Sequence, residues 1–148
     1  MPRRRDDWLT RIKTVELEYA IAQSAMSRLK EAAERDPTIV PRNWMREIPG
    51  VAERLEGTYL IRLFAEFEAG LRQFWRTEKT TNPPMESLIN GIRRMGRIPA
   101  KLTDRVHEVR AFRNALVHDR EGESPRISLK EARAHLCKFF SWLPPEWP

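Results

Sequence analysis

The residues best able to do chemistry lie close together in the run Arg113-Asn114-Ala115-Leu116-Val117-His118. An arginine can bind two phosphate oxygens at once and stabilise negative charge that builds on them. A histidine titrates near neutral pH, so it can move a proton to or from a ribose hydroxyl or a leaving oxygen. The amide of Asn114 can hold a phosphate oxygen or orient the imidazole. Together these side chains suit phosphodiester cleavage, although an arginine and a histidine on one helix can also be structural.

The apolar spacing around this run predicts a helix that starts at a Thr103 cap and reaches about Asp119. At about 100° per residue, one face of this helix collects the residues that must be buried. That face consists of Leu102, Val106, Val109 and Leu116. Arg113 falls in the middle of this stripe, where an unpaired charge would be costly. We therefore expect Arg113 to reach a carboxylate, an interface or an anionic ligand.

Two further residues are expected to support the site. Glu68 lies on the flank of the apolar stripe of an earlier helix, so it is the better placed carboxylate to pair with Arg113 or Arg110. We interpret Glu68 as a salt-bridge partner that holds an arginine in place rather than as a catalytic group. Arg110, one turn before Arg113, is either a phosphate-binding group or a surface arginine. Asn114 and His118 are four positions apart and occupy adjacent turns of a neighbouring polar strip.

The string from Arg110 to Asp119 resembles the signature of the HEPN superfamily, in which an arginine, often followed by a polar residue such as asparagine, precedes a histidine by a few positions. An earlier run, Phe67-Glu68-Ala69-Gly70-Leu71-Arg72, is similar to an earlier helix of that family, where an acidic residue commonly precedes an apolar-basic pair. Both motifs occur in the family's order. The resemblance covers roughly residues 55–140.

This resemblance implies a metal-independent endoribonuclease that needs no cofactor, with the ribose 2′-hydroxyl attacking the adjacent phosphate. Arg113 and His118 would be the catalytic pair, and Asn114 the polar position between them. It also implies a homodimer in which two motif copies form one composite site. The expected role is in toxin–antitoxin or antiviral defence systems of prokaryotes, with an antitoxin or another regulatory protein as partner. Toxins paired with nucleotidyltransferase antitoxins usually carry a tyrosine where this chain has Arg120, which argues against that pairing.

The sequence is also compatible with two other functions. A non-catalytic HEPN domain could use the same motif to bind RNA or a partner protein. A helical nucleic-acid-binding regulator is less favoured, because no turn signal typical of a helix-turn-helix separates the third and fourth helices.

The elements that position these residues are predicted to form an antiparallel all-α bundle of about five helices, two of them long. Apolar periodicity, proline breaks and a capping box at Ser128 and Glu131 define them. The expected helices cover about residues 6–35, 51–78, 84–95, 103–119 and 128–143. A basic arm (1–6), a proline-containing loop (36–50) that pins Ile39, Val40 and Trp44 to the core, and a proline-rich tail (144–148) complete one domain of residues 1–148.

Composition limits the classes of function. The chain has 148 residues, of which 41% are hydrophobic and 32% charged, so it is globular. Its net charge of +6 suits a polyanion such as RNA, but equally fits a protein that binds no nucleic acid. No apolar run is long enough for a membrane span, so we expect no membrane association. The one cysteine, Cys137, lies among apolar neighbours and indicates a buried thiol in a reducing, cytoplasmic setting.

Other chemistries find no support in the sequence. Three histidines and one cysteine show no spacing of a zinc site, and no glycine-rich loop suits nucleotide phosphates. We interpret His107 and His135 as structural or solvent-facing. Among the tryptophans, Trp8, Trp75 and Trp142 fit helix-packing stripes. Trp44 and Trp147 lie in irregular segments, where an exposed ring could stack on a base.

Overall fold

The structure is a computed structural model that describes residues 4–148. Over these residues the chain is all-α, as predicted, with five α-helices and no strand. The helices are α1 (Arg5–Arg35), α2 (Arg42–Glu78), α3 (Met85–Gly96), α4 (Ala100–Val117) and α5 (Leu129–Phe140). Single turns of 3-10 helix lie in two connections, at Pro37–Ile39 and Glu121–Glu123.

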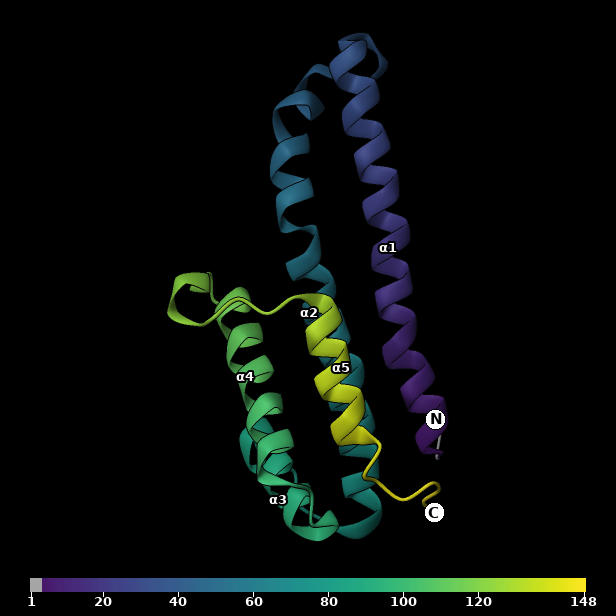
Figure 1. Ribbon diagram of the computed structural model, residues 1–148, viewed down its shortest axis with the longest axis vertical. Coiled ribbons are helices and arrows are strands. Elements are labelled where there is room, and N and C mark those ends of the chain that lie inside the picture. Colours follow the sequence, from purple (N-terminus) through teal and green to yellow (C-terminus); the bar gives the residue numbers. More distant parts are fainter. Residues whose placement is uncertain (1–3) are drawn as a thin grey trace.

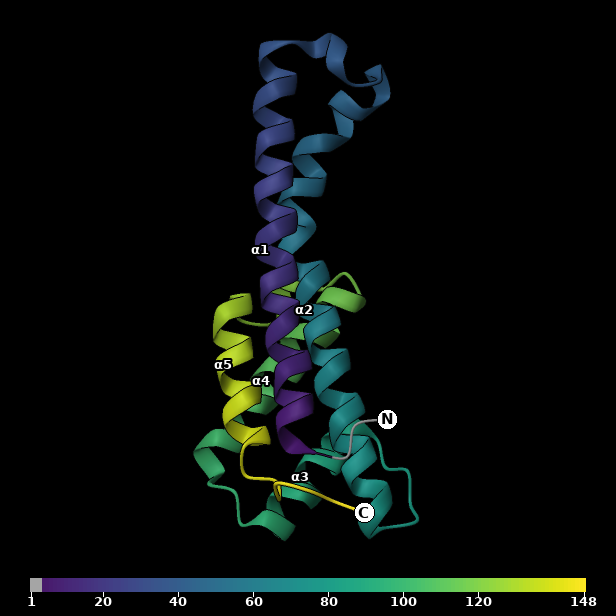
Figure 2. The same cartoon turned by 90° about the vertical axis from the view of Figure 1, so that its right-hand side faces the viewer.

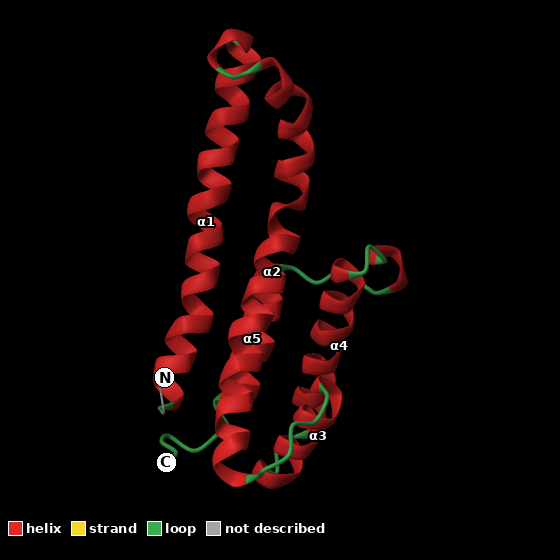
Figure 3. Ribbon diagram, turned by 180° about the vertical axis from the view of Figure 1, so that it is seen from behind, coloured by secondary structure: helices red, strands yellow, loops and turns green. Residues whose placement is uncertain are grey.

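The two long helices, α1 and α2, form an antiparallel pair that runs through most of the height of the molecule (Figure 1). Helices α3, α4 and α5 pack beside the lower part of this pair only, so the connected ends of α1 and α2 stand clear of them (Figure 2). The start of α1 and the C-terminal end of the chain both lie toward the lower end of the bundle (Figure 3). The molecule therefore consists of a five-helix body and a projecting two-helix arm.

The body is held together by an aromatic cluster at its centre. The ring of Phe67 lies 5.7 Å from that of Phe64, 6.0 Å from that of Phe139 and 6.2 Å from that of Phe140, measured between centroids. All four rings are buried, and Trp8 from α1 is buried with them. Each such ring removes a large apolar area from water, so this cluster fastens α2 to α5 and α1.

The arm has a much smaller core of its own. Its buried residues are Ala33 at the end of α1, Val40 in the connection and Ile48 in α2. Met26, Leu29 and Met45 pack against them. We call residues 26–48 the arm. Since few apolar groups are buried here, the arm is less strongly packed than the five-helix body.

Helix α2 begins at Arg42, nine residues before the predicted start, so the expected loop over residues 36–50 is wrong in its second half. Pro49 lies inside the helix rather than ending it. A proline in a helix removes one hydrogen bond, which normally stops the helix. Here the preceding residue, Ile48, is buried against α1 and stabilises the helix on both sides of the proline. Val40 is buried as expected, whereas Ile39 and Trp44 are exposed.

The basic residues at the start of the chain are not a free arm where the structure describes them; residues 1–3 lie outside the described part. Arg5 begins α1 and donates to the carbonyl oxygens of Ser141 and Leu143 at 3.1 and 3.2 Å. Arg4 pairs with Glu146 at 3.3 Å. The start of α1 is therefore tied to the segment that follows α5.

The C-terminal tail is also packed rather than free. Trp147 is 5% exposed, and its ring lies 5.5 Å from that of Phe74 and 6.4 Å from that of Phe140. The prediction for the tryptophans is thus reversed at two positions, because Trp147 is buried and Trp142 is 46% exposed. Trp8 is buried, as predicted.

Candidate functional site

Helix α4 carries the candidate site and differs from the prediction at both ends. It begins after Pro99, three residues earlier than expected, and Thr103 is a buried residue inside it, donating its hydroxyl to the Pro99 carbonyl at 3.2 Å. Its last helical residue is Val117, so His118 stands at the C-cap position.

The end of α4 is closed by a Schellman motif. Asp119 adopts the left-handed conformation, with φ of 56°. The N–H of Arg120 donates to the Ala115 carbonyl at 2.6 Å, and that of Asp119 to the Leu116 carbonyl at 3.4 Å. These bonds satisfy carbonyls that the last turn would otherwise leave unpaired. They also determine where the backbone turns away, and this turn presents the side chain of His118 to solvent.

Arg113 lies where the apolar stripe predicted it, half-buried between α4 and α2. Its guanidinium carbon lies 4.6 Å from the centre of the Phe64 ring, a cation–π contact. One terminal nitrogen lies 3.8 Å from a carboxylate oxygen of Glu68, which confirms the expected pairing. Its Nε atom is buried and has no hydrogen-bond partner within residues 4–148. The guanidinium therefore keeps a donor unused.

Glu68 is held from a second side by Arg72, one turn later on α2. The Nε of Arg72 donates to Glu68 Oε1 at 2.9 Å, while Arg113 approaches Oε2. Arg72 in turn donates to Asn82 Oδ1 at 3.1 Å and to the Pro83 carbonyl at 2.9 Å. The connection between α2 and α3 thus positions Glu68, and Glu68 positions Arg113. The sequence did not indicate this use of Arg72, because the loop that anchors it has no recognisable spacing.

Arg110 joins a different group. Its terminal nitrogen lies 3.7 Å from Glu86 of α3, and its Nε donates to His107 Nδ1 at 3.3 Å. His107 Nε2 lies 2.8 Å from Asn90 Oδ1. An imidazole that accepts at Nδ1 and donates at Nε2 is neutral. The structural interpretation of His107 agrees with these bonds.

Because of this arrangement, the stability of the fold should depend on pH through the protonation of His107. Burial, and then the positive charge of Arg110, lower the pKa of His107 below its usual value, against the opposing effect of Glu86 and Asp104. As the pH falls through about 6.5, the unfolded chain takes up the proton before the folded chain does. We expect the free energy of unfolding to decrease from there until the lower folded pKa is passed.

Urea unfolding of wild type and of a His107→Gln variant, measured at steps between about pH 7 and 5, tests this. The difference in unfolding free energy between the two proteins should change across this range in favour of the variant at lower pH. A constant difference would show that His107 titrates alike in both states.

The remaining two residues of the motif are Asn114 and His118. Asn114 is half-buried and His118 exposed, and neither side chain makes a hydrogen bond or ion pair with another residue of the described chain. The His118 backbone N–H donates to the Asn114 carbonyl at 3.0 Å, so the two residues stack on adjacent turns as predicted. Five positions at about 100° each place Arg113 and His118 about 140° apart around the axis. One copy of the chain therefore does not bring the two together over a single cleft.

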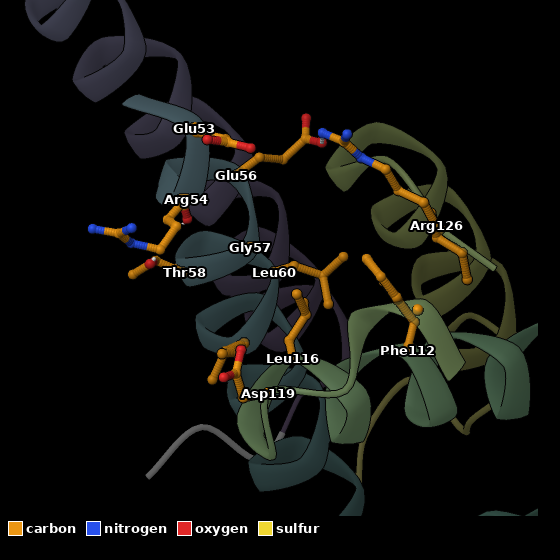
Figure 4. A pocket seen from close by; sticks show the side chains of 13 residues that line it. Glu53, Arg54, Glu56, Gly57, Thr58, Leu60, Phe112, Leu116, Asp119 and Arg126 are labelled. Atoms are coloured by element: carbon orange, nitrogen blue, oxygen red, sulfur yellow. Dashed lines mark hydrogen bonds and ion pairs between the residues drawn. The ribbon is translucent and has the colours of Figure 1, made fainter. Parts of the chain in front are cut away.

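A pocket of about 660 Å³ lies beside the C-terminal half of α4, between α2 and the segment that follows α4. Figure 4 shows Leu60, Phe112 and Leu116 on its apolar wall, with Glu56 facing Arg126 at its mouth. These two charged side chains form an ion pair of 3.7 Å. Asp119 lines the pocket, but Arg113, Asn114 and His118 do not. No sequence pattern indicates the pocket, because its walls come from segments far apart in the chain.

Cys137 is buried, as predicted, and burial raises the pKa of its thiol. Across residues 4–148, no three side chains of histidine, cysteine, aspartate or glutamate converge as metal ligands would. No helix in this part of the chain combines the length and the apolar character needed to cross a bilayer.

Comparison with models of protein families, with curated proteins and with solved structures found no match to this chain. The assignment of a function therefore depends on the residues and their geometry.

Proposed function

We propose that the protein is a metal-independent endoribonuclease of the HEPN type, active as a homodimer. The observation that carries the proposal is the end of α4. There, an exposed His118 without a side-chain partner in the described chain follows Arg113, whose buried Nε also lacks one. A free imidazole and a guanidinium with an unused donor are the groups that phosphodiester cleavage needs.

In the proposed reaction, the ribose 2′-oxygen attacks the adjacent phosphorus and the bond from phosphorus to the 5′-oxygen breaks. His118 takes the proton from the 2′-hydroxyl, and the protonated His118 of the second copy gives one to the leaving 5′-oxygen. Arg113 stabilises the negative charge on the non-bridging phosphate oxygens, and Asn114 holds one of them or orients the imidazole. The products are a 2′,3′-cyclic phosphate and a 5′-hydroxyl.

The need for two copies follows from the helix geometry. Within one chain Arg113 points toward α2, while His118 stands about 140° around the axis at the end of α4. A second α4 end, related by a two-fold axis, can place its His118 beside the first chain's Arg113. Glu68, held by Arg72, keeps the arginine in position, and Arg110 supplies further positive charge for the phosphate backbone.

The biological role proposed with this activity is that of the toxic or effector component of a prokaryotic defence or toxin–antitoxin system in the cytoplasm. An antitoxin or another regulatory protein would restrain it. The excess of basic residues favours a polyanionic substrate such as RNA over a neutral or basic one.

The activity is tested with the purified full chain, a single-stranded RNA and excess EDTA. We expect fragments with 2′,3′-cyclic phosphate and 5′-hydroxyl ends. The same sequence made as DNA, or with 2′-O-methyl groups, should remain intact because it lacks the nucleophile. Cleavage that requires an added metal ion, or cleavage of the 2′-blocked strand, would contradict the mechanism.

A second candidate is a non-catalytic HEPN domain that binds RNA or a protein. It is favoured by the contacts of Arg113 with Phe64 and Glu68, since these also suit an arginine that only joins two helices. Binding of RNA without cleavage of any tested strand would support this candidate over the first.

A further inference from the structure

The lower end of the bundle, away from His118, concentrates positive charge. Here α3 ends, α4 begins and α5 ends. Residues 87–103 and 134–145 together contain five basic residues and no acidic one. The basic residues are Arg93, Arg94, Arg97, Lys101 and Lys138, and all but the half-buried Arg93 are exposed. We call these five residues and Trp142 the basic end.

The end of α3 lies close to the segment that follows α5. A side-chain carbon added to Gly96 would lie 3.9 Å from the Trp142 carbonyl oxygen. Arg97, the next residue, is exposed and has a left-handed backbone with φ of 51°. Lys138 lies one turn before Trp142 on the α5 side. Exposed cations therefore lie on both segments that meet here, Arg97 after α3 and Lys138 on α5.

The backbone that carries Trp142 is held firmly although its ring is open. Arg5 donates to the carbonyls on both sides, those of Ser141 and Leu143, and Leu143 is buried. The N–H of Trp142 donates to the Phe139 carbonyl at 3.1 Å. The side chain is nevertheless 46% exposed. A large aromatic ring on a rigid support, left in water, costs free energy that a ligand can recover.

We infer that the basic end binds single-stranded RNA, with a base stacked on Trp142 and the neighbouring phosphates held by Arg94, Arg97 and Lys138. Stacking on an aromatic ring next to a cationic groove is how proteins hold unpaired strands without reading their sequence. Among the carboxylates at this end, Asp6 and Glu146 are each paired with an arginine, so they oppose an anionic strand less. The exposed Asp104 follows Lys101 within one turn of α4, so the phosphate contacts are assigned to Arg94, Arg97 and Lys138 rather than to Lys101.

This contact surface goes beyond the proposed active site. Helix α4 rises about 1.5 Å per residue, so its 18 residues separate the basic end from His118 by about 27 Å. A strand bound at Trp142 would reach the candidate cleavage site only through several further nucleotides. An anionic membrane is the weaker alternative, because Met95 and Trp142 are the large apolar residues exposed at this end, too few for insertion.

The test measures the affinity of a fluorescent twelve-nucleotide oligouridylate for the full-length chain carrying His118→Ala, which prevents its cleavage. Adding Trp142→Ala should weaken binding about 5- to 100-fold, and Trp142→Phe should restore most of it because stacking is retained. Ile21→Ala, which removes an exposed apolar side chain from α1, is the control and should have no effect. Arg94→Ala with Arg97→Ala should reduce the slope of log affinity against log salt by about 1.4.

Unchanged RNA affinity in Trp142→Ala would overturn the inference. So would loss of binding to vesicles of phosphatidylserine and phosphatidylcholine with no change for RNA, which would assign the surface to a membrane. All variants share the His118→Ala background, so a failure of the proposed cleavage leaves this result interpretable, and a failure of this binding leaves the cleavage assay unaffected.

Discussion

Replacing His118 with alanine is expected to lower the rate of RNA cleavage by about 10²–10⁴-fold, the usual contribution of a proton-transferring side chain. The free energy of unfolding should change by less than about 0.5 kcal/mol, because the imidazole is exposed and makes no contact with a partner in the described chain. Cleavage is followed with labelled RNA in EDTA, and stability by urea unfolding. Loss of activity without loss of stability separates a chemical role from a structural one.

His135→Gln is the matched control, since it alters a histidine outside the motif and should leave cleavage unchanged. Full cleavage by the His118→Ala protein would disprove the role of His118.

A mixing experiment tests whether two copies of the chain share one active site. Arg113→Ala and His118→Ala proteins, combined and allowed to exchange subunits, should regain a small part of the activity. A mixed dimer joins the intact arginine of one chain to the intact histidine of the other, but it lacks the second histidine that the full reaction uses.

Replacing Gly70 with alanine is expected to destabilise the fold. An added side-chain carbon would lie 2.7 Å from Cε2 and 2.8 Å from Cζ of Phe140, and 3.1 Å from Trp8. Both rings are fully buried, so neither can move aside without disturbing the core. Such overpacking costs about 1–3 kcal/mol, which exceeds the gain of about 1 kcal/mol from replacing glycine in a helix.

Gly50→Ala is the matched control on the same helix. There the added carbon meets only the guanidinium of Arg54, 3.1 Å away, at the end of a flexible exposed side chain. This variant should be more stable than wild type by up to about 1 kcal/mol. Thermal unfolding should therefore move in opposite directions for the two variants. Equal midpoints would show that α2, α5 and α1 do not meet as closely at Gly70 as the structure indicates.

The dimer proposed for cleavage and the basic end proposed for binding use opposite ends of α4. The distribution of charge agrees with RNA binding by the five-helix body rather than by the arm. Residues 26–48, the arm, carry five basic and four acidic residues. Most of the net positive charge of the chain therefore lies outside the arm, in the part that contains the candidate site and the basic end.

The sequence by itself determined most of the helices and the local position of the candidate residues. Hydrogen bonds in a helix join residues four apart, so periodicity and caps are visible along the chain. The Ser128 cap of α5 is confirmed, since its side chain accepts from the Glu131 N–H at 3.1 Å. The place of Arg113 within an apolar stripe is confirmed for the same reason, because one helix face is set by spacing alone.

Only the tertiary structure decided which distant groups meet. The start of α2 at Arg42 depends on Ile48 being buried against α1, a contact that outweighs the local signal of Pro49. The exposure of Trp142 and the burial of Trp147 depend on how the last residues fold back onto α2 and α5. Packing between helices depends on angles and distances that no spacing along one chain segment encodes, so these positions could be read only from the assembled bundle.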